Sequence, residues 1–442
     1  MARRGRRHAP RPAPSESYDL DIRALGDQGD GIAALPDGRT VFVDGALPGE
    51  KIRAEIFFRD RQPPRGEPAE ILTPSPLRRT PPCPVAGACG GCMVQHLAMD
   101  AYRAWKRDQV TARLAAAGLD TSKVGEMAET GERTRRRAVW QYRFGEGRLL
   151  FGYAVRRGER IVDVTDCLLL APALGAAMDG LRRELPALFD GPVVSRGRVL
   201  ATALEAGADI LIEFDRDPDL RQLEAMSGIA ERLDLARLAW RIGNRGEATP
   251  AAMRRLPSIR FGPFTPSVPA GAFLQASAAG EKLIRDEVMT ALEGVTGPVA
   301  DLFAGLGSLT GPVAQRHPVH AVEGMAAMAD ALSAAARSTP GPFPVTVETR
   351  DLDRRPLIAS ELDRFSAVVV DPPRAGAARQ AEEIARTANL RRIVYVSCSP
   401  DSFARDAARL TSAGWVLAGV RPIDQFIYSD QIELVARFDR GG

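Results

Sequence analysis

The C-terminal part of the sequence repeats one pattern, a short run of apolar and mostly β-branched residues that ends in polar ones. Val299–Leu302 runs into a Gly-x-Gly turn, Ala367–Val370 ends in Asp371, and Ile393–Val396 leads to Cys398. Apolar runs of this length, bounded by turn residues, predict buried strands. If these strands lie side by side in one sheet, their ends converge on one crevice. The pattern therefore predicts an α/β protein with its chemistry at the strand tips.

Cys398 is placed to present a thiol at the tip of such a strand. The following Ser399-Pro400 predicts a turn, because proline pushes the residue before it out of the helical region. Asp371 precedes the cysteine and Glu433 follows it, so a thiol and two carboxylates could meet in one crevice. The alternative is an inert core residue, since free cysteine is among the most buried residue types.

Composition limits the possible environments of the chain. A length of 442 residues with 45% apolar residues predicts several globular domains, and the net charge of +3 is too small to argue for nucleic acid by itself. Met1–Pro14 holds five arginines and no acid, and is predicted to be a disordered basic tail rather than a signal peptide. No apolar stretch is long enough to span a membrane. Five cysteines without an export signal indicate a reducing, cytoplasmic location.

Residues 18–72 read as short alternating strands broken by glycine, which predicts a small β-barrel. The Gly29-Asp30-Gly31 turn and the segment Val41–Glu50 resemble the TRAM domain, an oligonucleotide-binding-like barrel attached to RNA-modifying enzymes. We therefore expect a TRAM barrel over residues 15–73. A barrel that serves only packing is the alternative.

Three cysteines follow within ten residues, in the pattern Cys83-x5-Cys89-x2-Cys92, with two glycines that let the backbone turn tightly. Such a cluster in a reducing compartment predicts a metal site. Cys167 is the remaining cysteine besides Cys398, and completes a set of four. The residues alone allow a four-thiolate zinc or an iron–sulfur cluster, and a chance grouping without metal stays possible.

The central region, residues 74–265, contains an amphipathic helix predicted over Asp100–Gly118. This helix could pack on the C-terminal domain, which carries the catalytic candidates. Arg133–Arg160 then interleaves arginines with aromatic residues. Phosphates need cations and splayed bases need flat surfaces, so this stretch predicts binding of looped or single-stranded RNA. A merely solvated charged face is the alternative.

The turn after Val299–Leu302 carries the pattern D-L-F-x-G-x-G, and an acid, Glu323, stands at the end of the next strand. This order is similar to that of S-adenosylmethionine-dependent methyltransferases rather than NAD enzymes, although a dinucleotide site is the alternative. The resemblance implies that Glu323 binds the ribose hydroxyls and that Gly305 and Gly307 let the cofactor pack on the turn. Asp351, after a third strand, could face the adenine or be an exposed loop acid.

The motifs Asp371-Pro372-Pro373-Arg374-x-Gly376, Ile393–Cys398, Ile423-Asp424-x-Phe426 and Ile432-Glu433 together resemble the RNA 5-methyluridine methyltransferase family over nearly the whole chain. The resemblance implies a Rossmann-like class I methyltransferase domain over residues 266–442. The TRAM barrel and the cysteines make the chain similar to the branch that methylates uridine in 23S ribosomal RNA. They also favour a [4Fe-4S] cluster over zinc. No protein partner is evident from the sequence, and we expect a monomer.

The chemistry that the resemblance implies starts from the weakness of uracil carbon 5 as a nucleophile. The Cys398 thiolate would add to carbon 6, and Glu433 would later remove the carbon-5 proton. Gln275 and Asp371 would orient the pyrimidine and the cofactor, and Phe303 and Ser308 would line the cofactor pocket. Four positions depart from the family pattern: Ser399, Ser402, Ile427 and Gln431.

Three other functions remain open at this point. The substrate could be transfer RNA, or the product could be 5-methylcytidine, although no second cysteine remains to release it. The chain could also be an RNA-binding ribosome assembly factor that retains a methyltransferase fold without catalysis.

Overall fold

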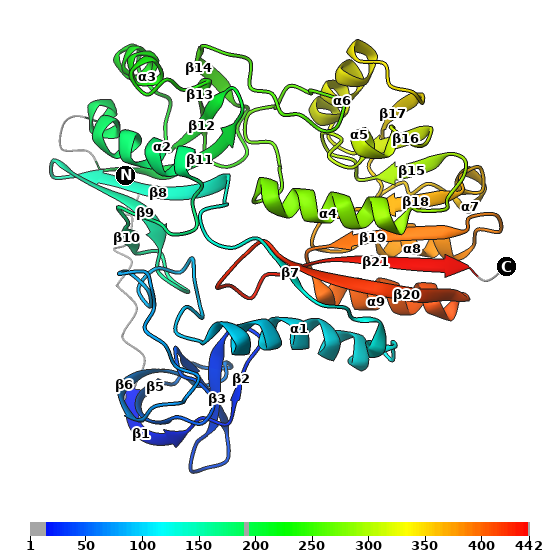
Figure 1. Ribbon diagram of the computed structural model, residues 1–442. Coiled ribbons are helices and arrows are strands. Elements are labelled where there is room, and N and C mark those ends of the chain that lie inside the picture. The colour runs from blue at the N-terminus through cyan, green and yellow to red at the C-terminus, as the bar shows by residue number, and fades with distance from the viewer. Residues whose placement is uncertain (1–14, 190–193, 441–442) are drawn as a thin grey trace, which may run out of the picture. The chain divides into compact units, whose positions relative to one another are not determined.

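The computed structural model describes residues 15–189 and 194–440, in two compact units (Figure 1). The first unit contains residues up to Gly87, Cys92–Trp105 and Tyr428–Asp430, and the second contains Ala88–Gly91, Lys106–Ile427 and the C-terminal segment from Gln431. The predicted basic tail, residues 1–14, lies outside the described residues.

The first unit is built on a six-stranded sheet in the order β1-β5-β6-β4-β3-β2. In β5 every second residue is buried, so Ile52, Ala54 and Ile56 face one core while the residues between them face water. The strands are β1 (Ser15–Asp21), β2 (Ala24–Leu25), β3 (Asp30–Ala34), β4 (Thr40–Asp44), β5 (Lys51–Phe57) and β6 (Arg65–Thr73). The alternating strands expected from the sequence are therefore present.

Helix α1 (Met99–Ala116) contributes residues to both units, since the second unit continues from Lys106. Its bounds agree with the helix predicted over residues 100–118. A seven-stranded sheet in the order β10-β9-β8-β11-β12-β13-β14 follows. Its strands are β8 (Arg137–Gly145), β9 (Arg148–Ala154), β10 (Ile161–Asp163), β11 (Ser195–Leu204), β12 (Gly207–Phe214), β13 (Arg237–Ile242) and β14 (Thr249–Met253). The helical segments are α2 (Pro172–Glu184), α3 (Leu220–Arg232) and the 3-10 turns η1 (Thr121–Lys123) and η2 (Leu185–Leu188).

The expectation that the aromatic rings of Arg133–Arg160 form a stacking surface is wrong for four of its five rings. Trp140, Tyr142, Phe144 and Phe151 are all buried. The alternation of β8 sends its aromatic residues into the core and leaves Arg143 exposed on the other face. The basic face remains available to phosphates, but these rings stabilise the sheet.

The C-terminal sheet has eight strands in the order β17-β16-β15-β18-β19-β21-β20-β7. Its strands are β15 (Val299–Leu302), β16 (Val319–Glu323), β17 (Val345–Thr349), β18 (Ala367–Val370), β19 (Arg392–Ser397), β20 (Trp415–Asp424), β21 (Glu433–Arg440) and β7 (Ala128–Glu129). The strands from β17 to β19 pair in parallel, while β21 runs antiparallel to both β19 and β20. The chain therefore reverses its order between β15 and β18, where open α/β sheets bind their ligands.

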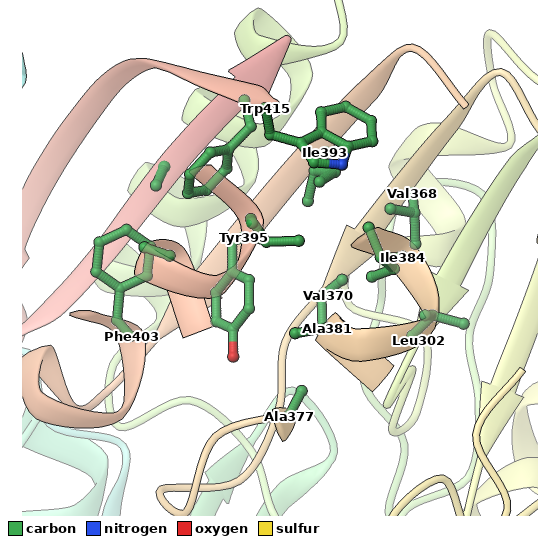
Figure 2. Close-up of a cluster of buried hydrophobic side chains, with 14 of the residues drawn as sticks. Leu302, Val368, Val370, Ala377, Ala381, Ile384, Ile393, Tyr395, Phe403 and Trp415 are labelled. Atoms are coloured by element: carbon green, nitrogen blue, oxygen red, sulfur yellow. The ribbon is translucent and has the colours of Figure 1, made fainter. Parts of the chain in front are cut away.

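Helices cover both faces of this sheet (Figure 1). They are α4 (Ala278–Ala291), α5 (Thr310–Val313), α6 (Ala326–Ser338), α7 (Ala359–Leu362), α8 (Ala378–Ala385) and α9 (Pro400–Ser412). Alternate residues of each strand point to opposite faces: Ile393 and Tyr395 pack with α8 and α9 in the cluster of Figure 2, and Val394 and Val396 pack on the opposite side. Burial on both faces explains why these strands are continuous apolar runs.

Val110 and Leu114 of α1 belong to the same cluster as Ile393 and Tyr395, so this helix adds to the core of the C-terminal sheet. Within the described part of the chain, no helix is long and apolar enough to cross a membrane.

Candidate active site

A cavity of about 590 Å³ opens at the carboxyl ends of β15, β16, β18 and β19. This volume is in the range of pockets that bind small ligands. Nine of the ten catalytic and cofactor residues predicted from the sequence line it: Gln275, Phe303, Gly305, Ser308, Glu323, Asp351, Asp371, Cys398 and Glu433. The exception is Gly307, a buried residue of the glycine turn that follows β15.

The turn after β15 is held in a conformation that few residues adopt. Phe303, Gly305 and Gly307 have φ values of 63°, 58° and 90°, all in the left-handed region. A Cβ on Gly307 would lie 2.4 Å from Cδ1 of Leu332 on α6, so only glycine lets this helix approach the turn. The result is an open backbone turn that borders the cavity.

Glu323 at the end of β16 is fixed against this turn. Its two carboxylate oxygens accept hydrogen bonds from the backbone N–H of Gly305, at 2.8 Å, and of Met325, at 2.7 Å. Because Glu323 is buried and held from both sides, it presents a defined acceptor at the cavity wall. A carboxylate so placed suits the vicinal hydroxyls of a ribose.

Asp351 is an exposed residue that caps its own loop. Its Oδ1 accepts from the backbone N–H of Asp353, at 3.0 Å, and of Arg354, at 3.1 Å. It lines the cavity together with the buried Leu352, so the loop, more than the carboxylate alone, forms this part of the wall.

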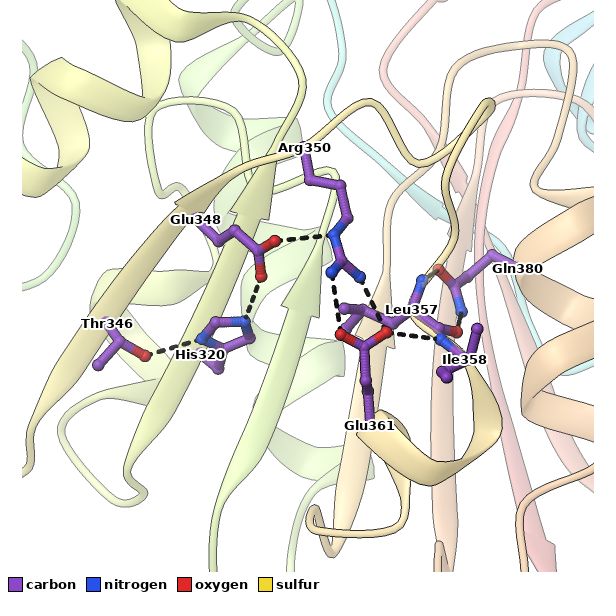
Figure 3. Close-up of polar contacts among 8 residues, drawn as sticks. All are labelled: His320, Thr346, Glu348, Arg350, Leu357, Ile358, Glu361 and Gln380. Carbon is purple, nitrogen blue, oxygen red and sulfur yellow. Dashed lines mark hydrogen bonds and ion pairs between the residues drawn. The ribbon is translucent and has the colours of Figure 1, made fainter.

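A polar network holds the base of that loop (Figure 3). Arg350 forms an ion pair with Glu348 at 2.7 Å and donates two hydrogen bonds to Glu361, at 3.0 and 2.9 Å. Glu348 is also bonded to His320, and the backbone N–H of Arg350 donates to the carbonyl of Glu323 at 2.9 Å. These contacts hold the end of β16, which carries Glu323, against the end of β17, which carries Glu348.

Cys398 follows β19 and is half-buried in the cavity wall. Burial raises the pKa of its thiol to about 11, and the charges of Glu433 and Asp371 act in the same direction, while Arg374 opposes them. At neutral pH the thiol in this environment is therefore protonated. A nucleophilic thiolate requires that ligand binding changes this environment.

Glu433 opens β21 and is buried beside the cavity. Burial raises the pKa of its carboxyl to about 7, although a hydrogen bond from Gln425 and the charge of Lys106 oppose the shift. Burial, together with the charge of Glu433, also raises the pKa of Asp371 to about 7. Two carboxyl groups that titrate near neutral pH beside a thiol can accept and release protons during a reaction.

Gln425 is a functional candidate that the sequence did not reveal, because it occupied the unassigned position of the motif Ile423-Asp424-x-Phe426. Its amide nitrogen donates to Oε1 of Gln275, at 2.7 Å, and to Oε1 of Glu433, at 3.1 Å. The three buried side chains form one chain of hydrogen bonds along the cavity.

The family of this fold is decided by sequence comparison. Residues 15–69 match the model of the TRAM domain, and residues 345–438 match that of tRNA (Uracil-5-)-methyltransferase. The chain is 39% identical over 429 residues to an uncharacterized RNA methyltransferase of Caulobacter vibrioides, with 96% of this chain and 100% of the relative covered. It is 34% identical over 443 residues to the 23S rRNA (uracil(1939)-C(5))-methyltransferase RlmD of Halomonas elongata, covering 96% and 90% of the two chains.

The chain belongs to the RNA uracil-C5 methyltransferase family. It is an S-adenosylmethionine-dependent enzyme with a TRAM domain. The fold agrees, since the solved Pyrococcus abyssi tRNA (uracil-54, C5)-methyltransferase in complex with S-adenosyl-L-homocysteine aligns with a TM-score of 0.69 at 20% identity, covering 95% and 99% of the two chains.

The cavity of the methyltransferase fits S-adenosylmethionine. Gly305 of the glycine turn borders the cavity, and the carboxylate of Glu323 at its wall is held by two backbone N–H groups. Cys398 and Glu433 border the same space, so a methyl donor and a pyrimidine can share it.

The structure does not show the metal site expected from the four cysteines. Across residues 15–189 and 194–440, no group of three or more His, Cys, Asp or Glu side chains is arranged to hold a metal ion. Cys83 and Cys92 belong to the first unit of the chain, and Cys89 and Cys167 to the second. Within the second unit, the charges of Cys89 and Cys167 both act on the buried Tyr153 hydroxyl and help to raise its pKa, after the larger effect of burial.

Proposed function

We propose that this methyltransferase transfers a methyl group from S-adenosylmethionine to carbon 5 of a uridine in 23S ribosomal RNA, through a covalent bond between Cys398 and uracil carbon 6. The observation that carries the proposal is the joint presence of Cys398, Asp371 and Glu433 in the wall of the cavity that borders the glycine turn. A thiol and a buried carboxyl group are what this chemistry requires.

The protein groups act in three steps. First, the Cys398 thiol loses its proton to a carboxylate of the site, and the thiolate adds to carbon 6, which raises electron density on carbon 5. The bound cofactor supplies an electrophilic methyl group, which carbon 5 takes. Then the Glu433 carboxylate accepts the carbon-5 proton, the C5–C6 double bond re-forms, and the C6–S bond breaks to release the thiolate.

The residues around the pyrimidine have orienting roles in this scheme. Gln275 is held by Gln425 and offers its amide to the base, and Asp371 offers a carboxyl group. The ring of Phe273 is 61% exposed at the cavity, with the Arg137 guanidinium 5.0 Å from its centroid, so it can contact a base that has left its stack.

Ribosomal RNA is preferred as substrate because relatives named as 23S rRNA methyltransferases cover nearly the whole chain, at 34% and 32% identity. Transfer RNA is the second candidate, since the matched family model and the solved structure of similar fold carry that name. The test offers unmodified 23S rRNA and unmodified tRNA separately with methyl-labelled S-adenosylmethionine. We expect 5-methyluridine in 23S rRNA alone; label confined to tRNA, or found in 5-methylcytidine, would contradict the proposal.

A non-catalytic role in ribosome assembly makes a different prediction. In a strain that lacks the gene, Cys398→Ala should fail to restore 5-methyluridine but should restore assembly if the protein acts only by binding RNA. We expect the substitution to abolish the modified nucleoside while RNA binding remains.

We also propose that Cys83, Cys89, Cys92 and Cys167 hold a [4Fe-4S] cluster, with zinc as the alternative. The spacing of the first three cysteines, and Cys167 as the remaining cysteine besides Cys398, support this set. Protein purified without oxygen should be brown and contain about four iron atoms per chain if the cluster is present. Colourless protein with one zinc would favour the alternative, and metal-free protein would contradict both.

We further propose bounds for the domains, a cellular location and an oligomeric state. We divide the chain into a basic tail (1–14), a TRAM barrel (15–73), a central domain (74–265) and a methyltransferase domain (266–442), and we expect a cytoplasmic monomer. Light scattering of the purified protein tests the oligomeric state: a mass near 47.6 kDa agrees, and twice that mass contradicts it.

A further inference from the structure

Lys106 of α1 is fully buried, and its position is not explained by packing alone. Its Nζ lies 3.0 Å from Oδ1 of Asp424, and both side chains have 0% exposure. The same ammonium group donates a hydrogen bond to the backbone carbonyl of Gln431. Removing two charges from water is costly, and a buried ion pair often stabilises a fold no better than apolar residues of the same volume. A fully buried pair therefore suggests another role.

Lys106 contacts two segments of the chain, one that carries Gln425 and one that carries Glu433, the proposed general base. Asp424 is the last residue of β20 and immediately precedes Gln425, while Gln431 lies two residues before Glu433, which opens β21. Oδ1 of Asp424 also accepts a hydrogen bond from the backbone N–H of Phe426 at 2.9 Å, so the chain is fixed on both sides of Gln425. The ammonium group of Lys106 thus fixes the segment of Gln425, the hydrogen-bond donor, beside the segment of Glu433, the acceptor.

Lys106 is also the positive charge that acts on Glu433. It lowers the pKa of the Glu433 carboxyl against the larger effect of burial, as does the hydrogen bond from Gln425. The other ionisable groups coupled to Glu433 are Asp371, after β18, and Cys398, after β19, and both would be negative when ionised.

A second ion pair lies at this side of the cavity but supports a different segment. Arg136 donates to Glu281 at 2.5 Å and to the backbone carbonyl of Gln275 at 3.1 Å. It fixes the chain at Gln275 and is already neutralised by Glu281. Lys106 differs from Arg136 because its charge acts on Glu433, the proposed general base.

We propose that Lys106 is a positioning residue for the reaction, which holds Gln425 and Glu433 in register and keeps Glu433 ionised for removal of the carbon-5 proton. The proposal rests on the covalent mechanism given above. The step it serves is the last one: the Glu433 carboxylate takes the proton, the electron pair of the C5–H bond re-forms the C5–C6 double bond, and the C6–S bond breaks with its pair on sulfur. Without the Lys106 charge, the methylated adduct should form but resolve slowly.

The test uses two neutral variants of the full-length protein. Lys106→Gln keeps hydrogen-bond donors for Asp424 and Gln431, and the double variant Lys106→Met with Asp424→Asn leaves no unpaired charge. The matched control removes another buried ion pair, Arg237 with Asp209, joined at 2.8 and 2.7 Å in the central sheet, by Arg237→Met with Asp209→Asn. Release of free methylated RNA in a single turnover is followed from pH 6 to 9, and covalent protein–RNA adduct is measured on denaturing gels.

We expect both Lys106 variants to shift the rising limb of the pH–rate profile upward by about one pH unit, from a midpoint near 7, which slows product release about fivefold at pH 7. Adduct should accumulate at pH 7 and resolve at pH 9, whereas the control pair should leave the pH midpoint unchanged. A wild-type midpoint without adduct in a folded Lys106 variant would overturn the proposal. So would unfolding of both variants while the control folds, because Lys106 would then be a structural residue.

Glu433→Gln separates this outcome from a failure of the mechanism itself. If it traps adduct while the Lys106 variants behave as wild type, only the role of Lys106 is refuted. If it traps none and no 5-methyluridine is made by the wild type, the proposed function fails.

Discussion

The side-chain amide of Gln425 donates to the carboxylate of Glu433 at 3.1 Å, and through this contact two strand ends meet at the cavity. The same nitrogen also donates to Gln275 at 2.7 Å. Gln425 therefore orients one group proposed to bind the pyrimidine and one proposed to remove its proton.

Gln425→Leu should reduce the rate of methylation by about a hundredfold, in line with the loss of a preorganised hydrogen bond in an active site. The loss of this donor also raises the pKa of Glu433 further, so adduct should build up at neutral pH. Gln222→Leu is the control, since this buried amide donates to the carbonyl of Leu188, remote from the cavity, at 2.7 Å. Methylation by Gln425→Leu at the wild-type rate would show that the contact has no role.

Glu433→Gln should make the protein more stable to heat at pH 8. The folded-state pKa of Glu433 is about 7, above the ordinary value of 4.5 for a glutamate, so the folded protein binds this proton more tightly than the unfolded chain. Stability is therefore lost as pH rises from about 4.5 to 7, and glutamine, which does not ionise, escapes this loss. The gain, on the order of 3 kcal/mol at pH 8, should be smaller at pH 5.5. Melting curves at the two pH values test this; an equal difference at both would contradict it.

Gly307→Ala should weaken binding of S-adenosylmethionine and destabilise the fold. A Cβ at this position would lie 2.4 Å from Leu332 and adopt a φ of 90°. Gly414 has almost the same φ, 89°, but nothing within 4 Å of a Cβ. Gly414→Ala should therefore cost about 1 kcal/mol from backbone strain alone, and Gly307→Ala about 1–3 kcal/mol more. Equal losses of stability, with unchanged cofactor affinity, would rule out the close approach of α6 as the reason for glycine.

Arg350→Gln should raise the KM for S-adenosylmethionine about tenfold while kcat changes little. In the network of Figure 3, Arg350 supports the loop after β17 that lines the cavity. The proposed reacting groups lie elsewhere, since Cys398 follows β19 and Glu433 opens β21. Arg386→Gln, which removes an exposed ion pair with Glu383, is the control and should change neither constant. A fall in kcat with unchanged KM would mean that the network acts on the chemical step instead.

The strands and the turn that build the site could be predicted because their sequence signals are local. Ala367–Val370 is a strand with the predicted bounds, and a strand over Val299–Leu302 precedes the glycine turn as predicted. The residues at the ends of both strands line one cavity. Gln425 and Lys106 could not be found in the same way. Their roles depend on partners far along the chain, and no local pattern distinguishes them from ordinary buried residues.

Two other expectations met physical limits of the same kind. The aromatic residues of β8 were expected to face RNA, but strand alternation places Trp140 and Tyr142 in the core, and composition alone does not reveal this register. The cysteine set depends on distances between separated segments, such as those of Cys92 and Cys167, which spacing in the sequence does not determine.

The central claim is that Cys398 attacks uracil carbon 6, and trapping of the adduct tests it most directly. RNA that carries 5-fluorouridine in place of uridine has no carbon-5 proton for Glu433 to remove, so the covalent intermediate should persist after methyl transfer. Mass spectrometry of the digested complex should find one methylated fluorouridine nucleotide on the peptide that contains Cys398, and none with Cys398→Ala. A nucleotide attached elsewhere, or 5-methyluridine formed by Cys398→Ala at the wild-type rate, would contradict the account.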